Sequence, residues 1–279
     1  MIAGSLALVA SAFLHAAWNA LLKRERDPQV AVAGVLAAAL AVAVAAAWAS
    51  PGPAFPTQAS LGWALAAGIL EALYFVTLAG ALSRGAYGVV YTVARGGALL
   101  LVWPAAALLL GEAASGRVLA GAAAVLVGLA LVAAGGATRE AWGGVGWASA
   151  CAASIAGYHL AYERSLRAGA APAPLFALAL GVAMPVVLAL SRNRGAGLRA
   201  FRDPRTAARW LLAGVLCTAS FLLFLRGLAA TGPAVALTLR NTAVVFAQAL
   251  ALAIGERVPP RQAVGALLVA AGATAVAWR

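Results

Sequence analysis

Two arginines stand near the middle of long apolar segments, where a charged side chain is costly. Arg95 is the tenth residue of the segment 86–110, and Arg240 is the ninth residue of the segment 232–254. An ionisable group at the centre of a bilayer costs roughly 2.5–3.5 kcal/mol, so it requires a partner, a wet cavity or a function. Because a guanidinium binds carboxylates and phosphonates through paired hydrogen bonds, both arginines are candidate substrate-binding residues. Structural pairing, with backbone carbonyls or across the molecule, is the alternative.

Polar neighbours at helical spacing extend this candidate site. Tyr91 lies one helical turn before Arg95, and Gln248 lies two turns after Arg240, so each pair would share one face of a continuous helix. Asn241 directly follows the second arginine. We predict that Tyr91, Asn241 and Gln248 contact the substrate together with the arginines.

The first and third apolar segments add three more candidates for substrate binding. His15 and Asn19 are four residues apart on the segment 3–22, so they would line the cavity from the same helix face. A histidine in a helix can also be a structural residue with its hydrogen bonds satisfied. Tyr74, on the segment 61–82, is either part of the cavity wall or an interfacial aromatic residue.

Three residues are candidates for carrying a coupled proton. Glu71 could act as a proton switch if its carboxyl holds a proton when it is isolated and releases that proton when it meets Arg95 or the substrate. Counted along the helices from the turn at 83–86, Glu71 and Arg95 differ in depth by about 4–5 Å, which a long arginine could bridge as an ion pair. His159 and Glu163 share a helix face, and histidine titrates near neutral pH.

The composition requires that these residues be positioned inside a membrane. Apolar residues make up 64% of the 279 residues, charged residues only 10%, and the mean hydropathy is +0.94. Because soluble domains carry about 25% charged residues, we predict an all-α integral membrane protein. The net charge of +12 lies mostly between the apolar segments, which favours contact with anionic lipid over nucleic acid. Cys151 and Cys217 lack the paired spacing of a metal or disulfide site, and we expect no metal or other cofactor.

Ten segments are long enough to cross a hydrocarbon core about 30 Å thick. The predicted transmembrane helices are residues 3–22, 29–50, 61–82, 86–110, 117–136, 143–165, 171–190, 208–227, 232–254 and 260–278. Thirteen lysines and arginines fall on the side reached after the odd-numbered spans, and five fall on the other side. The positive-inside rule therefore places both termini outside the cytoplasm.

An internal repeat relates the two halves of the chain. The stretch HAAWNALLKRERDP (15–28) aligns with HLAYERSLRAGAAP (159–172) at a constant shift of 144 residues. We therefore predict two five-helix repeats, residues 1–138 and 139–279. Because five is an odd number, the second repeat would cross the membrane in the inverted orientation, as in many secondary transporters.

Three motifs occur in the same order as in one transporter family. They are LHAAWNALLKR in the first span, VVYTVARGG followed by LLLGE in the fourth, and LRNT followed by ALAIGERVPPRQAVGALLVAAG across the ninth and tenth. Together they resemble the EamA-like family of the drug/metabolite transporter superfamily. The resemblance implies a carrier of the bacterial inner membrane, with both termini in the cytoplasm and a cavity lined by spans 1, 3, 4, 6, 8 and 9. Asn241 departs from the acidic residue that related sequences often carry there.

We therefore predict a secondary membrane transporter that moves a small metabolite (an amino acid, an organic anion or a phosphonate) by alternating access. A lipid-carrier flippase or a cationic drug exporter of the same fold is the alternative. An enzyme is not expected, because the chain contains no H-E-x-x-H or G-x-S-x-G motif. The lack of a Walker-type glycine motif argues against transport driven by ATP. The expected partners are a small-molecule substrate, the lipid bilayer and, in the coupled case, protons, with the chain acting as a monomer or a homodimer.

Overall fold

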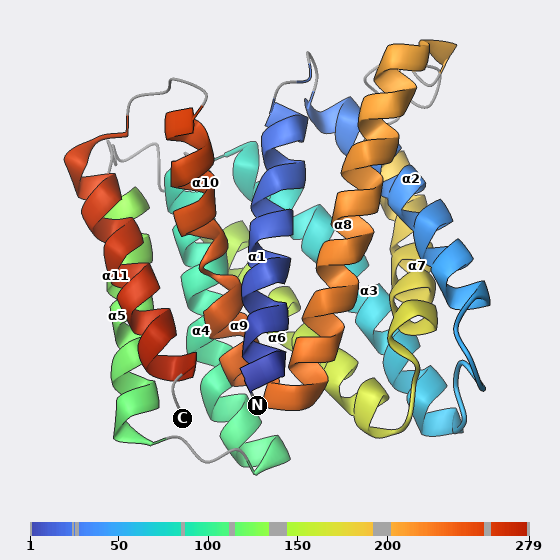
Figure 1. The fold of residues 1–279 in the computed structure, drawn as a ribbon, viewed down its shortest axis with the longest axis horizontal. Helices are drawn as coiled ribbons and strands as arrows, with labels where there is room; N and C mark the ends of the chain where they lie inside the picture. Colours follow the sequence, from blue (N-terminus) through green and yellow to red (C-terminus); the bar gives the residue numbers. More distant parts are fainter. Residues whose placement is uncertain are drawn as a thin grey trace.

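The computed structural model describes residues 2–23, 25, 28–84, 87–111, 115–133, 144–191, 202–253 and 258–277, and these residues form helices and no strands. The helices are α1 (Ile2–Lys23), α2 (Pro28–Trp48), α3 (Gln58–Leu82), α4 (Tyr87–Leu110), α5 (Gly116–Ala133), α6 (Val145–Arg167), α7 (Pro172–Ser191), α8 (Pro204–Thr231), α9 (Pro233–Arg240), α10 (Ala243–Ala253) and α11 (Pro260–Ala277). Figure 1 shows them as a bundle of roughly aligned helices with both chain ends at the same end of the bundle.

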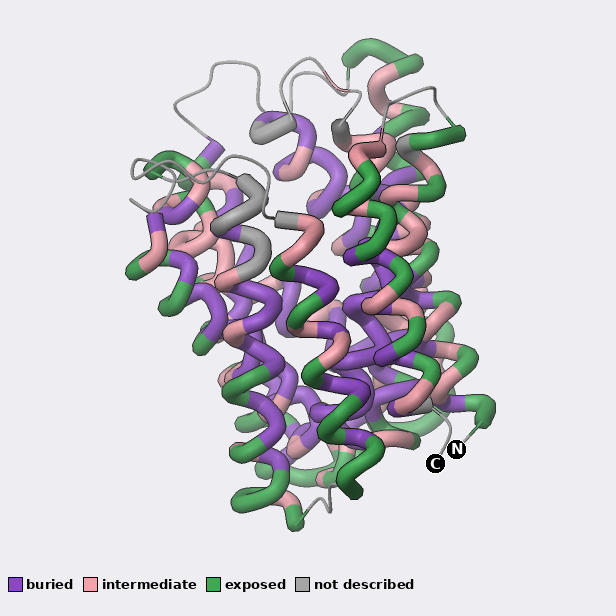
Figure 2. Tube along the Cα trace, turned by 90° about the vertical axis from the view of Figure 1, so that its left-hand side faces the viewer, coloured by how far each residue is buried: buried purple, intermediate pink, exposed green. Residues whose placement is uncertain are grey.

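The all-α membrane fold predicted from hydropathy is confirmed. Six of the described helices are long and apolar enough to cross a membrane. Large apolar side chains such as Leu108 and Leu267 are 84% and 68% exposed, which fits contact with lipid. Figure 2 shows buried positions along the inside of the bundle and exposed ones on its outer faces.

Two elements differ from the predicted spans. The ninth predicted span, 232–254, is divided into α9 and α10, which are separated by the turn at Asn241 and Thr242. The eighth begins earlier than predicted, because the Asp203 carboxylate accepts a hydrogen bond from Thr206 N and a proline occupies the first turn of α8. At 28 residues, α8 is about 42 Å long, and its first turns extend beyond the neighbouring helices (Figure 1).

The helices pack in pairs that recur in the two halves of the chain. Helix α1 packs along α8, and α6 packs along α3; α2 also contacts α8, and α7 also contacts α3. Helices α5 and α11 pack against each other at one side of the bundle (Figure 1). Each half therefore places its first helix against the third helix of the other half.

The closest helix packing depends on glycines. A Cβ atom added to Gly265 of α11 would lie 2.6 Å from the carbonyl oxygen of Gly128 on α5, and one added to Gly128 would lie 2.5 Å from the carbonyl oxygen of Gly265. Gly121 and Gly272 form a second pair of this kind. Because lipid supplies no hydrophobic driving force between helices, such close backbone contact stabilises the pair through dispersion forces.

We predict that Gly265→Ala destabilises the protein by about 1–3 kcal/mol, because the new methyl group would overlap backbone atoms that cannot move aside. Gly62→Ala is the matched control, since the added Cβ at this position of α3 would meet nothing within 4 Å. The control should be neutral or slightly stabilising, because alanine has the higher helix propensity. Thermal unfolding of the detergent-solubilised variants measures both, and equal midpoints would contradict the packing argument.

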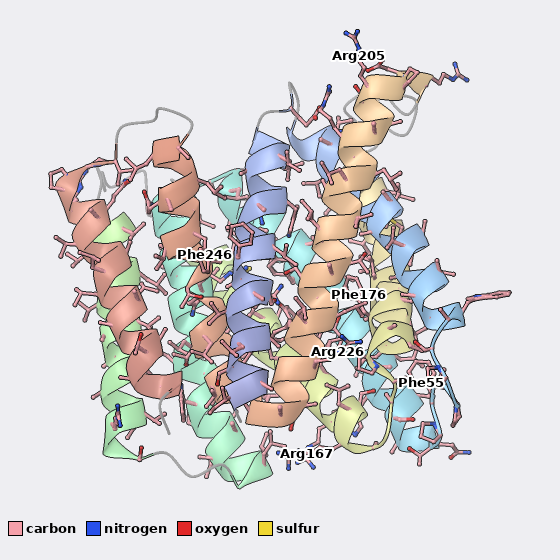
Figure 3. The ribbon with its side chains drawn as sticks, viewed as in Figure 1. Phe55, Arg167, Phe176, Arg205, Arg226 and Phe246 are labelled. Carbon is pink, nitrogen blue, oxygen red and sulfur yellow. The ribbon has the colours of Figure 1, made fainter. Side chains whose placement is uncertain are left out.

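The distribution of charge gives a second prediction. Arg202, Arg205 and Arg209 lie near the start of α8, and Arg205 is labelled at its protruding end in Figure 3. The positive-inside rule places this arginine-rich end in the cytoplasm. Alkaline phosphatase fused after Arg279 should therefore be active, and the same enzyme fused after Asp27 should be inactive. The opposite pattern would place the termini inside, as the family resemblance implies.

Candidate functional site

His15 lies between the two intramembrane arginines. Its Nε2 atom is 3.2 Å from Arg95 Nη2, and its Nδ1 atom is 3.4 Å from Arg240 Nη2. The three residues come from α1, α4 and α9, so the site joins helices from both halves of the chain. The arginines approach one site, as their depth in the sequence predicted, and His15 is the residue that they share.

The hydrogen-bonding capacity of His15 is smaller than the number of donors around it. Trp18 Nε1 donates to His15 Nδ1 at 3.2 Å, and the indole N–H can only donate. If Nδ1 accepts this bond, Nε2 of a neutral ring carries the proton and faces the guanidinium of Arg95, which is also a donor. In the other tautomer, Nδ1 carries the proton and faces two further donors, Trp18 Nε1 and Arg240 Nη2. In either tautomer the site has more N–H donors than acceptors.

Arg240 is held by contacts on three sides. Its Nη1 atom donates to Ser11 Oγ at 3.0 Å, and its guanidinium lies 4.6 Å and 4.4 Å from the ring centroids of Phe221 and Phe224. Such cation–π contacts contribute about 0.5–2 kcal/mol each. Arg240 is only 2% exposed, and none of these contacts supplies a negative charge. The guanidinium is therefore positioned but not neutralised by them.

Ser11 connects Arg240 to α8. Ser11 Oγ donates to the carbonyl oxygen of Ser220 at 2.7 Å, and Ser220 Oγ donates to the carbonyl oxygen of Ser11 at 2.9 Å. The two bonds clamp α1 to α8 directly beside the site. A third contact between neighbouring elements is the bond from Trp103 Nε1 on α4 to Thr238 Oγ1 on α9, at 3.3 Å.

The break between α9 and α10 occurs directly after Arg240. Asn241 N donates to Leu237 O, and Thr242 N donates to Leu239 O in the tighter pattern of a 3₁₀ turn. The Asn241 side chain is 1% exposed, and neither its oxygen nor its nitrogen has a hydrogen-bond partner in the structure. A buried amide without partners is costly, so Asn241 remains a candidate for binding a ligand next to Arg240.

Glu71 is a second buried polar centre beside this site. It is 4% exposed on α3, and its Oε2 atom has no hydrogen-bond partner in the structure. The Tyr162 hydroxyl lies near the Glu71 carboxyl but forms no hydrogen bond with it. The positive charge of Arg240 is close enough to attract an ionised Glu71. The ion pair expected between Glu71 and Arg95 is not among those formed by the described residues, which are Glu163–Arg167 and Glu25–Arg209.

Comparison with known proteins identifies a transporter family in the second half of the chain. Residues 142–278 match the model of the EamA-like transporter family. The chain therefore contains an EamA-like transporter domain. It is thus a membrane transporter of the drug/metabolite transporter superfamily, as the motifs of the sequence predicted.

One solved structure, titled only as the crystal structure of a protein, supports the fold of this EamA-like chain. It is 19% identical in sequence, covers 98% of this chain and 94% of its own, and superposes with a TM-score of 0.75. At this identity the likeness shows the fold alone. No curated protein matches the chain.

Three other predicted residues of the EamA-like transporter, His159, Glu163 and Asn19, form contacts with residues other than the two arginines. His159 Nδ1 lies 2.7 Å from Ile155 O, which leaves Nε2 buried without a partner, and the ring packs on Phe224. Glu163 is paired with Arg167 at 2.7 Å. Asn19 donates to His15 O at 2.7 Å from an exposed position on α1.

Two predicted residues have no contact with the arginines among the interactions described, and the side chain of a third is not described. Tyr74 is half-buried on α3 and packs edge-on against Tyr158, with ring centroids 6.0 Å apart. Gln248 is half-buried on α10, beyond the break, so it does not share a continuous helix with Arg240. The side chain of Tyr91 lies outside the described residues.

Sequence reasoning missed four residues that shape the site of this EamA-like protein. Trp18 is 9% exposed and bonded to His15, although a tryptophan near the end of a span commonly lies at the membrane interface. Its spacing of three residues from His15 was the available signal. Ser11, Phe221 and Phe224 carry no sequence signal, because serine and phenylalanine are ordinary residues of apolar helices.

We predict that Ser11→Ala destabilises the EamA-like protein by about 1–3 kcal/mol, because it leaves Arg240 Nη1 without its hydroxyl acceptor and removes the buried bond to the Ser220 carbonyl. Ser154→Ala is the control, since Ser154 is also buried but donates only to Ala150 O of its own helix. That variant should stay within about 0.5 kcal/mol of the wild type. The two effects are compared by thermal unfolding, and equal losses would remove Ser11 from the positioning of Arg240.

Proposed function

We propose that this protein is a secondary transporter of a small organic anion, bound between Arg95 and Arg240 at His15. The main support for this proposal is a surplus of hydrogen-bond donors. Three N–H groups converge on one imidazole, which can accept a hydrogen bond at only one nitrogen. A carboxylate or phosphonate would bring acceptor oxygens and negative charge to a site that has too little of both. Asn241, with both amide atoms unpartnered, would add a hydrogen bond to the same ligand.

An inverted repeat of two five-helix units, with the boundary near residue 138, is part of this proposal. Its support is the recurrent packing, in which α1 lies along α8 as α6 lies along α3. The glycine pairs give independent support, because Gly121 and Gly265, like Gly128 and Gly272, are separated by the same 144 residues as the repeated motif. In such folds the substrate site lies near the midplane, between the repeats.

Alternating access is favoured by the different surroundings of α9 and α10. Every residue of α9 is buried, and the helix packs against α1, α4, α6, α8 and α11. Helix α10 packs mainly against α1 and α11, and Leu252 on it is 59% exposed. The half of this span that lies toward the chain termini is therefore held by five helices, while the other half packs mainly against two. We infer that α10 is the half that can move when access to the central site alternates.

The membrane location and the coupling ion complete the proposed function. A bacterial inner membrane is the proposed location, and protons are the proposed coupling ion. Of the three proton candidates, Glu71 is favoured, because Glu163 is already neutralised by Arg167. His159 lies against Phe224, whose ring also covers Arg240, so it could respond to the site only through that ring.

We predict that purified protein in liposomes catalyses counterflow of an anion from a panel of malate, glutamate and methylphosphonate. Arg240→Ala and Arg95→Gln should each lower that counterflow at least tenfold, since a hydrogen bond to a charged group contributes about 1.5–3 kcal/mol. Arg226→Ala is the matched control, because Arg226 is an exposed arginine on α8, labelled in Figure 3. It should transport at the wild-type rate.

Two results would contradict the proposed function. Unchanged anion transport by Arg240→Ala would remove the arginines from the site. Transport of cationic drugs alone from a wider panel would make both arginines structural and would leave Glu71 as the main binding residue. Size-exclusion profiles of the variants separate these outcomes from loss of folding.

A further inference from the structure

The Glu71 carboxyl is enclosed by several helices, and no ion pair of the described residues includes it. The titratable or charged groups that act on it are Tyr158 and Tyr162 from α6, Cys217 from α8 and Arg240 from α9. Helix α7, which also packs on α3, contains no titratable residue, and Arg95 of α4 acts on Tyr158. Among these groups only the arginines carry a permanent positive charge.

The position of the carboxyl suits a neutral acid better than a carboxylate. A buried carboxylate without a hydrogen-bonded partner carries a desolvation cost of several kcal/mol. Arg240 directs its Nη1 and Nη2 atoms to Ser11 and His15, and it forms no ion pair with Glu71 in the described residues. Only a proton on Glu71, or a shift of the carboxyl toward Arg240, removes this cost.

The charges of the site then constrain how an anion can enter. With Glu71 ionised and no ligand, the two arginines and the carboxylate sum to one positive charge. With a monovalent anion between the arginines and Glu71 protonated, the sum is again one positive charge. An anion that entered while Glu71 stayed ionised would cancel the whole charge and place two negative groups beside Arg240, which like-charge repulsion disfavours.

We propose that Glu71 and the transported anion compete for the positive charge of Arg240, so that each anion is carried together with one proton on Glu71. This inference rests on the proposed anion site and adds its coupling: an electroneutral anion–proton symport for a monovalent substrate. Removal of the proton lets Glu71 neutralise Arg240 in the empty carrier. The empty and the loaded forms thus carry equal charge through the membrane interior.

The test uses liposomes that contain the full-length protein and the panel anion that gives counterflow. An inward proton gradient should drive accumulation of a monovalent anion by about tenfold per pH unit, because one pH unit corresponds to about 1.36 kcal/mol. Glu71→Gln should lose this accumulation and keep counterflow within about twofold of the wild type, since a neutral amide imitates the protonated acid. Glu25→Gln, at the exposed ion pair with Arg209, should behave as the wild type.

A second measurement detects the bound proton directly, without a transport assay. Addition of the same anion to purified wild-type protein in a weakly buffered detergent solution, at a pH where the empty carrier is deprotonated, should raise the pH by the uptake of about one proton per bound anion. Glu71→Gln should take up none. Proton uptake that persists in Glu71→Gln and disappears in Glu163→Gln would move the proton to Glu163 and overturn the inference.

The remaining outcomes separate this inference from the proposed function. Wild-type counterflow that is indifferent to the proton gradient, without proton uptake on binding, would overturn the coupling and leave the anion carrier intact. Loss of counterflow in folded Glu71→Gln would make Glu71 a substrate ligand and would also overturn it. The absence of counterflow for every anion in the wild type would reject the proposed function itself.

Discussion

The structure depends on how two guanidinium charges are held inside a membrane around a single histidine. Each charge would be costly in hydrocarbon, and for Arg240 the described residues lower that cost with hydroxyl and aromatic groups rather than with a carboxylate in contact. Ser11 and the two phenylalanine rings position Arg240, and His15 links it to Arg95. Under the proposed function, a carboxylate in direct contact would stabilise Arg240 more but would occupy the place of an anionic substrate.

Close packing of small residues makes this arrangement possible. Glycines at the α5–α11 contact let backbone approach backbone, so that these helices form a compact side of the bundle. Within the bundle, Ser11 and Ser220 fasten α1 to α8, and Ser165 Oγ on α6 donates to the carbonyl oxygen of Ser60 on α3 at 2.7 Å. Both pairs are therefore held by buried directional bonds. The bonds between α1 and α8 are the ones beside Arg240.

The sequence predicted the spans and the arginines well, because lipid imposes a strong and local rule on hydropathy. The ends of α1, α3, α4 and α7 lie within a few residues of the predicted limits. Depth along a helix could also be counted, which brought Arg95 and Arg240 to one level. Direction around a helix could not be counted. The Glu71–Arg95 ion pair that depth allowed is not among those of the described residues, and α3 packs on α6 and α7 and only lightly on α4, despite the short turn that joins them. The break after Arg240 escaped prediction too, since Asn241 and Thr242 occur in continuous helices as well.

The two histidines of the proposed duplication show how far the halves have diverged. His15 faces both arginines, whereas His159, its counterpart at the 144-residue shift, lies 2.7 Å from a carbonyl oxygen of its own helix and packs between Tyr158 and Phe224. A site with two equivalent histidines would place its ligand on the axis between the repeats. With only His15 directed at the guanidinium groups, the donors gather on the α1 side, and Glu71 with Tyr162 occupies the α3–α6 side. Under the proposed function, the duplication would supply one anion-binding half and one proton-binding half, and coupling between them would require no more than the charge of Arg240 that acts on both.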